Sequence, residues 1–296
     1  KHTLLIGFAR ENITPSMSVP MAGYGNTSMR FFNTVLDPIE ATCIAFTQGE
    51  DTVLLYTQDL LFAFRNVVLQ LREMLAGELG IPEERILICA THTHSAPDST
   101  KNLPSIQSYR SLYVGQMVKA AEKAVADLSP ATLSATSTNA ELNYIRHYRM
   151  VDGTYSGSNF GNWSIDIADH ARDNDPEMQL VKVTREGDKK DILMVNWQAH
   201  PCNTGGVEKL DISADYIAPL RDKIEADTDM HFIYFLGACG DQNATSRMED
   251  DHGLEHLEYG QKLAQYALDA LPNLQPVEGS GIQKTQLIYE GPVNHD

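Results

Sequence analysis

Short apolar runs alternate with amphipathic segments along this chain, and this pattern predicts its regular structure. The runs are rich in Val, Ile, Leu and aromatic residues, as in buried strands. They predict strands at Leu4–Ala9, Cys43–Thr47, Val53–Thr57, Ile86–Ala90, Thr132–Thr136, Gln179–Thr184, Ile192–Trp197, Phe232–Leu236 and Gly281–Ile288. Apolar residues at helical spacing predict helices at about Phe64–Leu79, Ser105–Leu128, Ser213–Ala226 and Leu254–Leu271, and Ser213 is expected to be the N-cap of the third.

The order of these elements predicts an α/β fold with mixed β-sheets and flanking α-helices. A hairpin is expected over Gly49–Asp51, so the sheets are not all parallel. The polar stretch Asp152–Asp175 predicts a long surface loop, of a kind that often lines a site. A length of 296 residues with no repeat or linker predicts a single large domain.

Two histidines stand where the strand Ile86–Ala90 ends. The sequence there is Thr-His-Thr-His-Ser-Ala-Pro, with the imidazoles at His92 and His94. Residues spaced i, i+2 on a strand point to the same face, so both imidazoles could bind one metal ion. The alternative is two polar residues in a turn that hydrogen-bond to nearby carbonyl groups.

Two further strand ends carry similar chemistry. His200 follows the apolar strand 192–197 and could join the other two histidines if the strands are neighbours; a partly buried structural histidine is the alternative. After the strand 232–236 comes Gly-Ala-Cys-Gly-Asp-Gln-Asn. There Asp241 could orient a histidine or bind metal, and Asn243 could donate to an oxyanion. An ordinary turn capped by the aspartate explains the same residues.

Charge and composition narrow the class of partner. The formal net charge of −17 argues against a nucleic-acid substrate. In this acidic chain Arg146, His147 and Arg149 form a small basic cluster that could hold an anion or a substrate oxygen, or form ordinary salt bridges. Without an 18-residue apolar run, no membrane insertion is expected. The four cysteines have no C-x-x-C spacing and are expected to be buried free thiols.

The order of these motifs resembles the neutral, non-lysosomal ceramidases and their bacterial relatives. The similar segments are Gly7–Pro15, Pro20–Gly25, the Thr-His-Thr-His-Ser-Ala-Pro motif, Ala199–Pro201 and Gly240-Asp241. The resemblance implies that His92 and His200 bind zinc, that His94 lies beside the metal, and that Arg146 contacts the substrate. It also implies amide-bond cleavage in a ceramide-like, lipid-like or other small-molecule substrate.

The sequence departs from the family in two places. Asn243 stands where ceramidases carry a catalytic serine, so efficient ceramide cleavage is not expected. The family's remaining zinc ligands, a glutamate and a tyrosine, are expected beyond residue 296. Residues 1–296 would then be a metal-hydrolase domain that lacks its C-terminal part.

The interpretation is a Zn²⁺-dependent hydrolase that cleaves an amide bond with metal-activated water. His94 or Asp241 is the candidate general base, Arg146 the candidate substrate anchor and Asn243 a further catalytic residue. The alternatives are a zinc hydrolase of another ester or sugar-linked substrate, and an inactive lipid- or glycan-binding module. The sequence leaves open the oligomeric state and whether this soluble protein is secreted, periplasmic or cytoplasmic.

Overall fold

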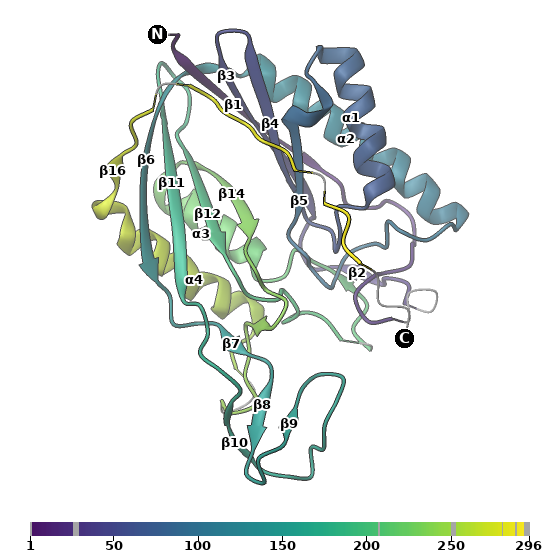
Figure 1. Cartoon of the computed structure of the whole chain (residues 1–296). Helices are drawn as coiled ribbons and strands as arrows, with labels where there is room; N and C mark the ends of the chain where they lie inside the picture. The colour runs from purple at the N-terminus through teal and green to yellow at the C-terminus, as the bar shows by residue number, and fades with distance from the viewer. Residues whose placement is uncertain are drawn as a thin grey trace.

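One large mixed sheet organises the molecule (Figure 1). The computed structural model describes residues 2–25, 30–206, 208–249, 253–279, 281–287 and 289–292. Within them, nine strands form the order β14-β12-β11-β6-β1-β3-β4-β5, with β16 beside β6. Their bounds are β1 Leu4–Asn12, β3 Glu40–Gln48, β4 Asp51–Gln58, β5 Ile86–Ala90, β6 Ser129–Asn139, β11 Glu177–Arg185, β12 Ile192–Trp197, β14 His231–Leu236 and β16 Gln275–Pro276. The predicted α/β fold with a mixed sheet is confirmed.

Helices cover one face of this sheet and create the larger apolar core. They are α1 Arg65–Leu79, α2 Pro104–Ala126, α3 Ile217–Thr228 and α4 His256–Ala270. Buried side chains of all four belong to the same cluster as sheet residues such as Tyr56 and Trp197. The described part of the chain contains no helix long and apolar enough to cross a lipid bilayer.

The two ends of the strand order are each built as a parallel β-α-β unit. β4 and β5 are parallel and joined through α1, while β12 and β14 are parallel and joined through α3. The other pairings in this sheet are antiparallel, including the predicted hairpin from β3 to β4. Four carboxyl ends of parallel strands are therefore available to carry loops, which is where α/β proteins commonly place a site.

The sheet curves until its two edges approach each other. β14 contacts β4 and β5, although these strands lie at opposite ends of the hydrogen-bonded order (Figure 1). A second apolar cluster joins Ile44 of β3 to Val183 of β11 and Ile233 of β14 on the face opposite the helices. This curvature brings the loops of the two parallel units together.

The surface loop predicted at Asp152–Asp175 is interrupted by two strands of a small three-stranded sheet, which was not predicted. β8 (Tyr148–Met150) pairs with both β9 (Tyr155–Ser156) and β10 (Ile167–His170), and the sheet projects from the main body (Figure 1). Its strands of two to four residues are too short to show a period-2 pattern. The remaining short strands are β2 Thr34–Val35, β7 Tyr144–Ile145, β13 Asp211–Ile212 and β15 Gln242–Asn243.

Two other local predictions are wrong. Residues 281–287 form no strand, and Ile288 lies outside the described residues. Alternating apolar residues there have no neighbouring strand to pair with, and pairing is what stabilises a strand. The helix expected from Ser213 begins instead at Ile217, because the hydroxyl of Ser213 bonds to the Asp37 carboxylate and is not a cap.

Candidate active site

The loop after β5 presents His92 and His94 differently from the sequence expectation. The strand ends at Ala90, and His92 has a left-handed backbone with φ of 64°. Such a conformation costs a non-glycine residue on the order of 1–3 kcal/mol and is found mainly at functional sites. His92 is fixed by the loop after β4, since its backbone N–H donates to Leu60 O at 3.0 Å and its Nδ1 lies 2.8 Å from Leu61 O.

His200 is held by similar contacts at the other end of the strand order. It follows β12, and its Nδ1 lies 2.7 Å from Cys239 O in the loop after β14. Its backbone N–H donates to Gln242 O at 2.8 Å in the same loop. Each of the two histidines is thus oriented by the loop that follows the parallel neighbour of its own strand.

The hydrogen bonds define which ring nitrogens are free to bind a ligand. His92, His94 and His200 each place Nδ1 against a backbone carbonyl, which for His94 is Gly23 O at 2.9 Å. A carbonyl oxygen only accepts, so Nδ1 carries the proton and each neutral ring has its lone pair on Nε2. This is the arrangement typical of metal-binding histidines, whose other nitrogen donates to a carbonyl or carboxylate.

These lone pairs converge. His92 Nε2 lies 3.2 Å from His200 Nε2, and the ring centroids of His92 and His94 are 4.9 Å apart. Two nitrogens bound to one tetrahedral zinc at about 2.0–2.1 Å would be about 3.3–3.4 Å apart. The observed separation fits a shared divalent cation, whereas two facing lone pairs without one repel each other.

The surroundings keep this cluster uncharged. Burial, together with smaller contributions from the neighbouring imidazoles and the Arg146 guanidinium, lowers the pKa of His94 to about 3 and that of His200 to about 4. Burial also lowers the pKa of His92. All three rings are therefore neutral at pH 7, which is the form that binds metal.

Cys239 is a donor that the sequence analysis did not include among the site residues. Its thiol and the ligand nitrogens of His92 and His200 all lie within 4.8 Å of one another. Burial raises the pKa of this thiol to about 11, so a metal ion would have to displace its proton. Its position directly before Gly240-Asp241, at the end of an apolar strand, was the available signal.

Buried hydroxyls connect the two histidine loops. Ser95 Oγ lies 3.0 Å from Thr204 Oγ1, and Thr204 donates to the Asp215 carboxylate from both its backbone N–H and its hydroxyl at 2.8 Å. His94 N–H also donates to Pro201 O at 3.1 Å. Asp215 therefore helps hold the His200 loop in place, and Ser95 has a structural contact.

The other predicted site residues, Asp241, Asn243 and Arg146, differ in their contacts. Asp241 forms an ion pair with Arg172, which occupies one oxygen of the candidate base. Asn243 lies close to the histidines, since it forms an isolated parallel bridge with His200. Arg146 is joined to the Gly-Asp loop by a bond from its N–H to Asp241 O at 2.9 Å.

Three polar atoms in this region are buried without a hydrogen-bond partner among the described residues. They are His94 Nε2, Arg146 Nε and Asn243 Oδ1. Such an atom costs about 1–3 kcal/mol, and exceptions of this kind in folded proteins call for an unseen partner or a function. Their grouping indicates that a ligand completes the site.

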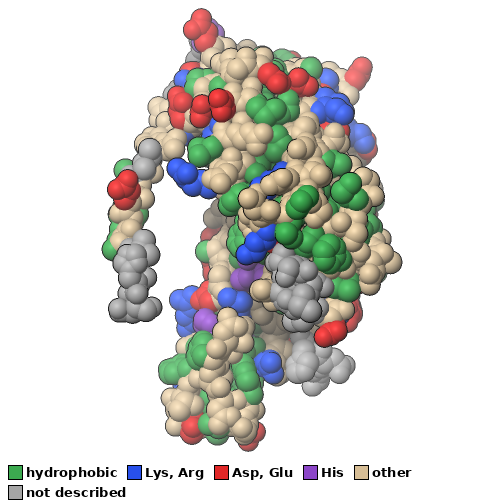
Figure 2. Space-filling view, turned by 90° about the vertical axis from the view of Figure 1, so that its right-hand side faces the viewer, with side chains coloured by type: hydrophobic (Ala, Val, Ile, Leu, Met, Phe, Trp, Pro, Cys, Tyr) green, Lys and Arg blue, Asp and Glu red, His purple; other side chains and the backbone are tan. Residues whose placement is uncertain are grey.

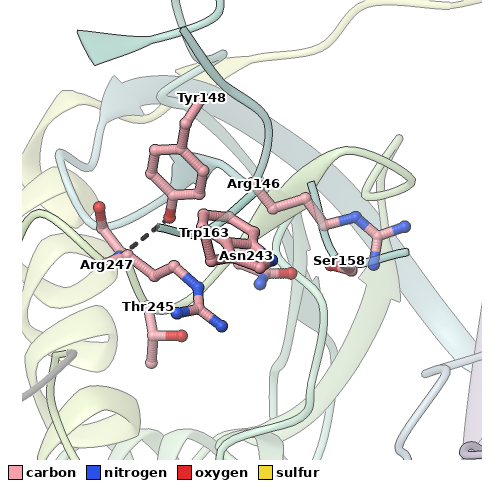
Figure 3. A pocket seen from close by; sticks show the side chains of 8 residues that line it. Arg146, Tyr148, Ser158, Trp163, Asn243, Thr245 and Arg247 are labelled. Carbon is pink, nitrogen blue, oxygen red and sulfur yellow. Dashed lines mark hydrogen bonds between the residues drawn. The ribbon is translucent and has the colours of Figure 1, made fainter. Parts of the chain in front are cut away.

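A cavity of about 360 Å³ lies beside Asn243 (Figure 3), the residue that is bridged to His200. It lies between the loop after β14 and the small sheet, near the place where Figure 2 shows histidine and basic side chains gathered above the projecting lobe. Its lining residues are Arg146, Tyr148, Ser158, Trp163, Asn243, Thr245, Ser246 and Arg247. The segment 152–175 thus lines a cavity, as predicted, through residues that lie between its two short strands.

Comparison with known proteins adds the fold relationship. No protein-family profile matches the chain, and no curated protein matches it in sequence. A ceramidase complexed with C2 and the neutral ceramidase from Pseudomonas aeruginosa match in structure, with TM-scores of 0.76 and 0.75. The chain has the fold of the neutral ceramidases.

The resemblance seen in the sequence is therefore confirmed for the fold. Each structural match has 18% sequence identity and covers 95% of this chain. The chain in turn spans 46% of each ceramidase, a little under half of its length. At this identity the activity and substrate of those enzymes do not follow from the fold alone.

Proposed function

We propose that this protein is a metal-dependent hydrolase that cleaves an amide or related acyl bond, with zinc held by His92 and His200. The observation that carries the proposal is the pair of Nε2 atoms 3.2 Å apart, both on rings whose Nδ1 donates to a carbonyl. A zinc ion there would supply Lewis acidity for activating water and polarising a carbonyl group. Cys239 is the candidate third ligand.

The chain's own groups suit the remaining steps of such a reaction. His94 presents a buried, unprotonated Nε2 that can accept a proton from an attacking water. Asn243 can donate from its amide to a developing oxyanion, and its unpartnered oxygen can hold an N–H of the substrate. Asp241 positions the loop through its ion pair with Arg172, which occupies one of its carboxylate oxygens.

Zinc stoichiometry in matched histidine variants tests the metal assignment. The protein loaded with zinc and passed through a desalting column should retain about one ion, and His92→Ala and His200→Ala should lose it. His231→Ala is the matched control, because this histidine lies at the opposite end of β14. Equal zinc retention in all four proteins would overturn the assignment.

Turnover tests the hydrolase assignment separately. The zinc-loaded protein should release free amine from N-acyl compounds, and His94→Ala should abolish release while keeping the metal. Stoichiometric zinc with tight binding but no turnover of amides, esters or glycosidic compounds would identify a binding module instead.

A further inference from the structure

The cavity beside the histidines has a composition opposite to that of the chain. Acidic residues outnumber lysine and arginine 40 to 23 in the sequence, yet among the described residues the cavity lining contains two arginines and no carboxylate. Four hydroxyl groups and the Asn243 amide add further hydrogen-bonding groups. Such a lining attracts anions and offers little to a long alkyl chain.

Arg247 is held in the cavity by specific contacts. Its guanidinium lies over the Trp163 ring, 4.1 Å from the ring centroid, and its backbone N–H donates to Tyr148 Oη at 2.9 Å. Trp163 and Tyr148 pack edge to face at 5.8 Å. A guanidinium stacked on an indole keeps its N–H groups in their plane, free for bidentate bonds to a carboxylate or phosphate.

Buried groups next to the cavity fix the positions of Tyr148 and of the segment that carries Arg247. Ser246, which is almost fully buried, lies with Oγ 3.2 Å from His170 Nε2. His170 in turn places Nδ1 2.6 Å from Ile145 O and its ring 5.0 Å from that of Tyr148. The small sheet and the loop after β14 therefore form one preorganised wall around Arg247.

The cavity is joined directly to the metal-binding region. Asn243 lines the cavity and is bridged to His200 through the backbone, and in Figure 3 its side chain lies between the Arg146 and Arg247 guanidinium groups. A single substrate can place its scissile bond at the histidines and extend another group past Asn243 to Arg247.

We propose that this cavity binds an anionic group of the substrate, a carboxylate or a phosphate, through Arg247 stacked on Trp163. The inference rests on the proposed hydrolase function and deepens it. The substrate class is then a small acyl compound with an anionic end, such as an N-acyl amino acid or an N-acyl aminoalkyl phosphate. A neutral lipid amide would leave the Arg247 guanidinium without its partner.

Anion binding can be measured without catalysis through the fluorescence of Trp163, which lies beside the proposed subsite. The chain has two tryptophans, of which Trp197 is fully buried and Trp163 is 38% exposed beside Arg247. We would titrate inorganic phosphate and acetate into the full chain, freed of metal by a chelator, at constant ionic strength. A saturable change in fluorescence is expected, and it should disappear in Trp163→Phe.

Arginine variants give the decisive comparison. Arg247→Gln should raise the Kd of the bound anion about tenfold or more, because a hydrogen bond to a charged group contributes about that factor. Arg247→Lys should keep part of the affinity. Arg149→Gln is the matched control, since this arginine is exposed on the same small sheet outside the cavity lining. No saturable change, or an equal Kd in Arg247→Gln, would overturn the subsite.

Kinetics with charged and neutral substrate pairs separate this inference from the proposed function. Each N-acyl amino acid is compared with its methyl ester, each aminoalkyl phosphate with its neutral alcohol, and both with an N-acylsphingosine. Arg247→Gln should raise KM for the charged compounds alone, and the better series identifies carboxylate or phosphate. Equal turnover of the neutral lipid overturns the subsite, whereas Arg247-dependent anion binding without any turnover overturns the hydrolase.

Discussion

Acidification should destabilise this fold through His200, and the size of the effect follows from the site. His200 is only 6% exposed, and burial lowers its pKa from 6.5 to about 4. Between these two pH values the imidazole of His200 is protonated in the unfolded chain and neutral in the folded chain. The free energy of unfolding therefore falls as the pH falls through this window, and the full stability is present only above the unfolded pKa.

The magnitude can be stated for one pair of conditions. Each pH unit in the window removes about 1.4 kcal/mol from the free energy of unfolding. Lowering the pH from 7.5 to 4.5 crosses about two units of the window, so it should cost about 2.7 kcal/mol through this residue alone. The metal-free protein would be unfolded with urea at both pH values, beside His200→Gln, whose side chain does not titrate. The wild type should lose about 2–3 kcal/mol more than the variant.

Titrating groups outside the histidine cluster cancel in this comparison because both proteins contain them in the same surroundings. Burial raises the pKa of Asp37 to about 6, for example, and that group acts with the opposite sign in both proteins. His2→Gln, which replaces an exposed histidine, is the control and should behave as the wild type. Equal losses of stability in the wild type and His200→Gln would refute the argument that the cluster is held neutral by burial.

Three further predictions concern the chemistry of the site. If Cys239 binds zinc as a thiolate, zinc binding at pH 7.5 should release about one proton more from the wild type than from Cys239→Ser, measured by calorimetry in buffers of different ionisation enthalpy; equal release from both excludes the thiol. Gly23→Ala should lower turnover at least tenfold while zinc stays bound, because the added methyl group would lie 2.9 Å from His94 Nδ1 and the backbone there has a φ of 119°. An unchanged kcat would show that the position of His94 does not matter. Sphingosine release from ceramide should be slow because Asn243 stands at the position of the family serine, and robust release measured by chromatography would contradict this.

Local structure was readable from the sequence because its signals are local. The run Ile192–Trp197 is all apolar but for Asn196, and it forms β12 with the predicted bounds. Helix α1 ends at Leu79, before Gly80 with φ of 66°, as the glycine predicted. The small sheet was missed because its strands have only two to four residues and are separated by turn-forming residues such as Gly153.

The meeting of the histidines followed a different route from the predicted one. The sequence analysis required the strands before His92 and His200 to be neighbours, but β5 and β12 lie far apart in the strand order. They meet through the curvature of the whole sheet, which depends on the summed twist of many pairings and leaves no local pattern. Cys239 was missed for a related reason, since only the folded loop brings its thiol towards the two imidazoles.

The closing of the sheet also has a consequence for folding. His92 and His200 are 108 residues apart in sequence, and they meet only when the first and last strands of the sheet have come together. A metal ion held by both would bridge the two edges and bind the folded chain in preference to the unfolded one, and the stabilisation would rise with the logarithm of the free metal concentration. Metal uptake during refolding would then report the final closure step, later than the formation of any single β-α-β unit.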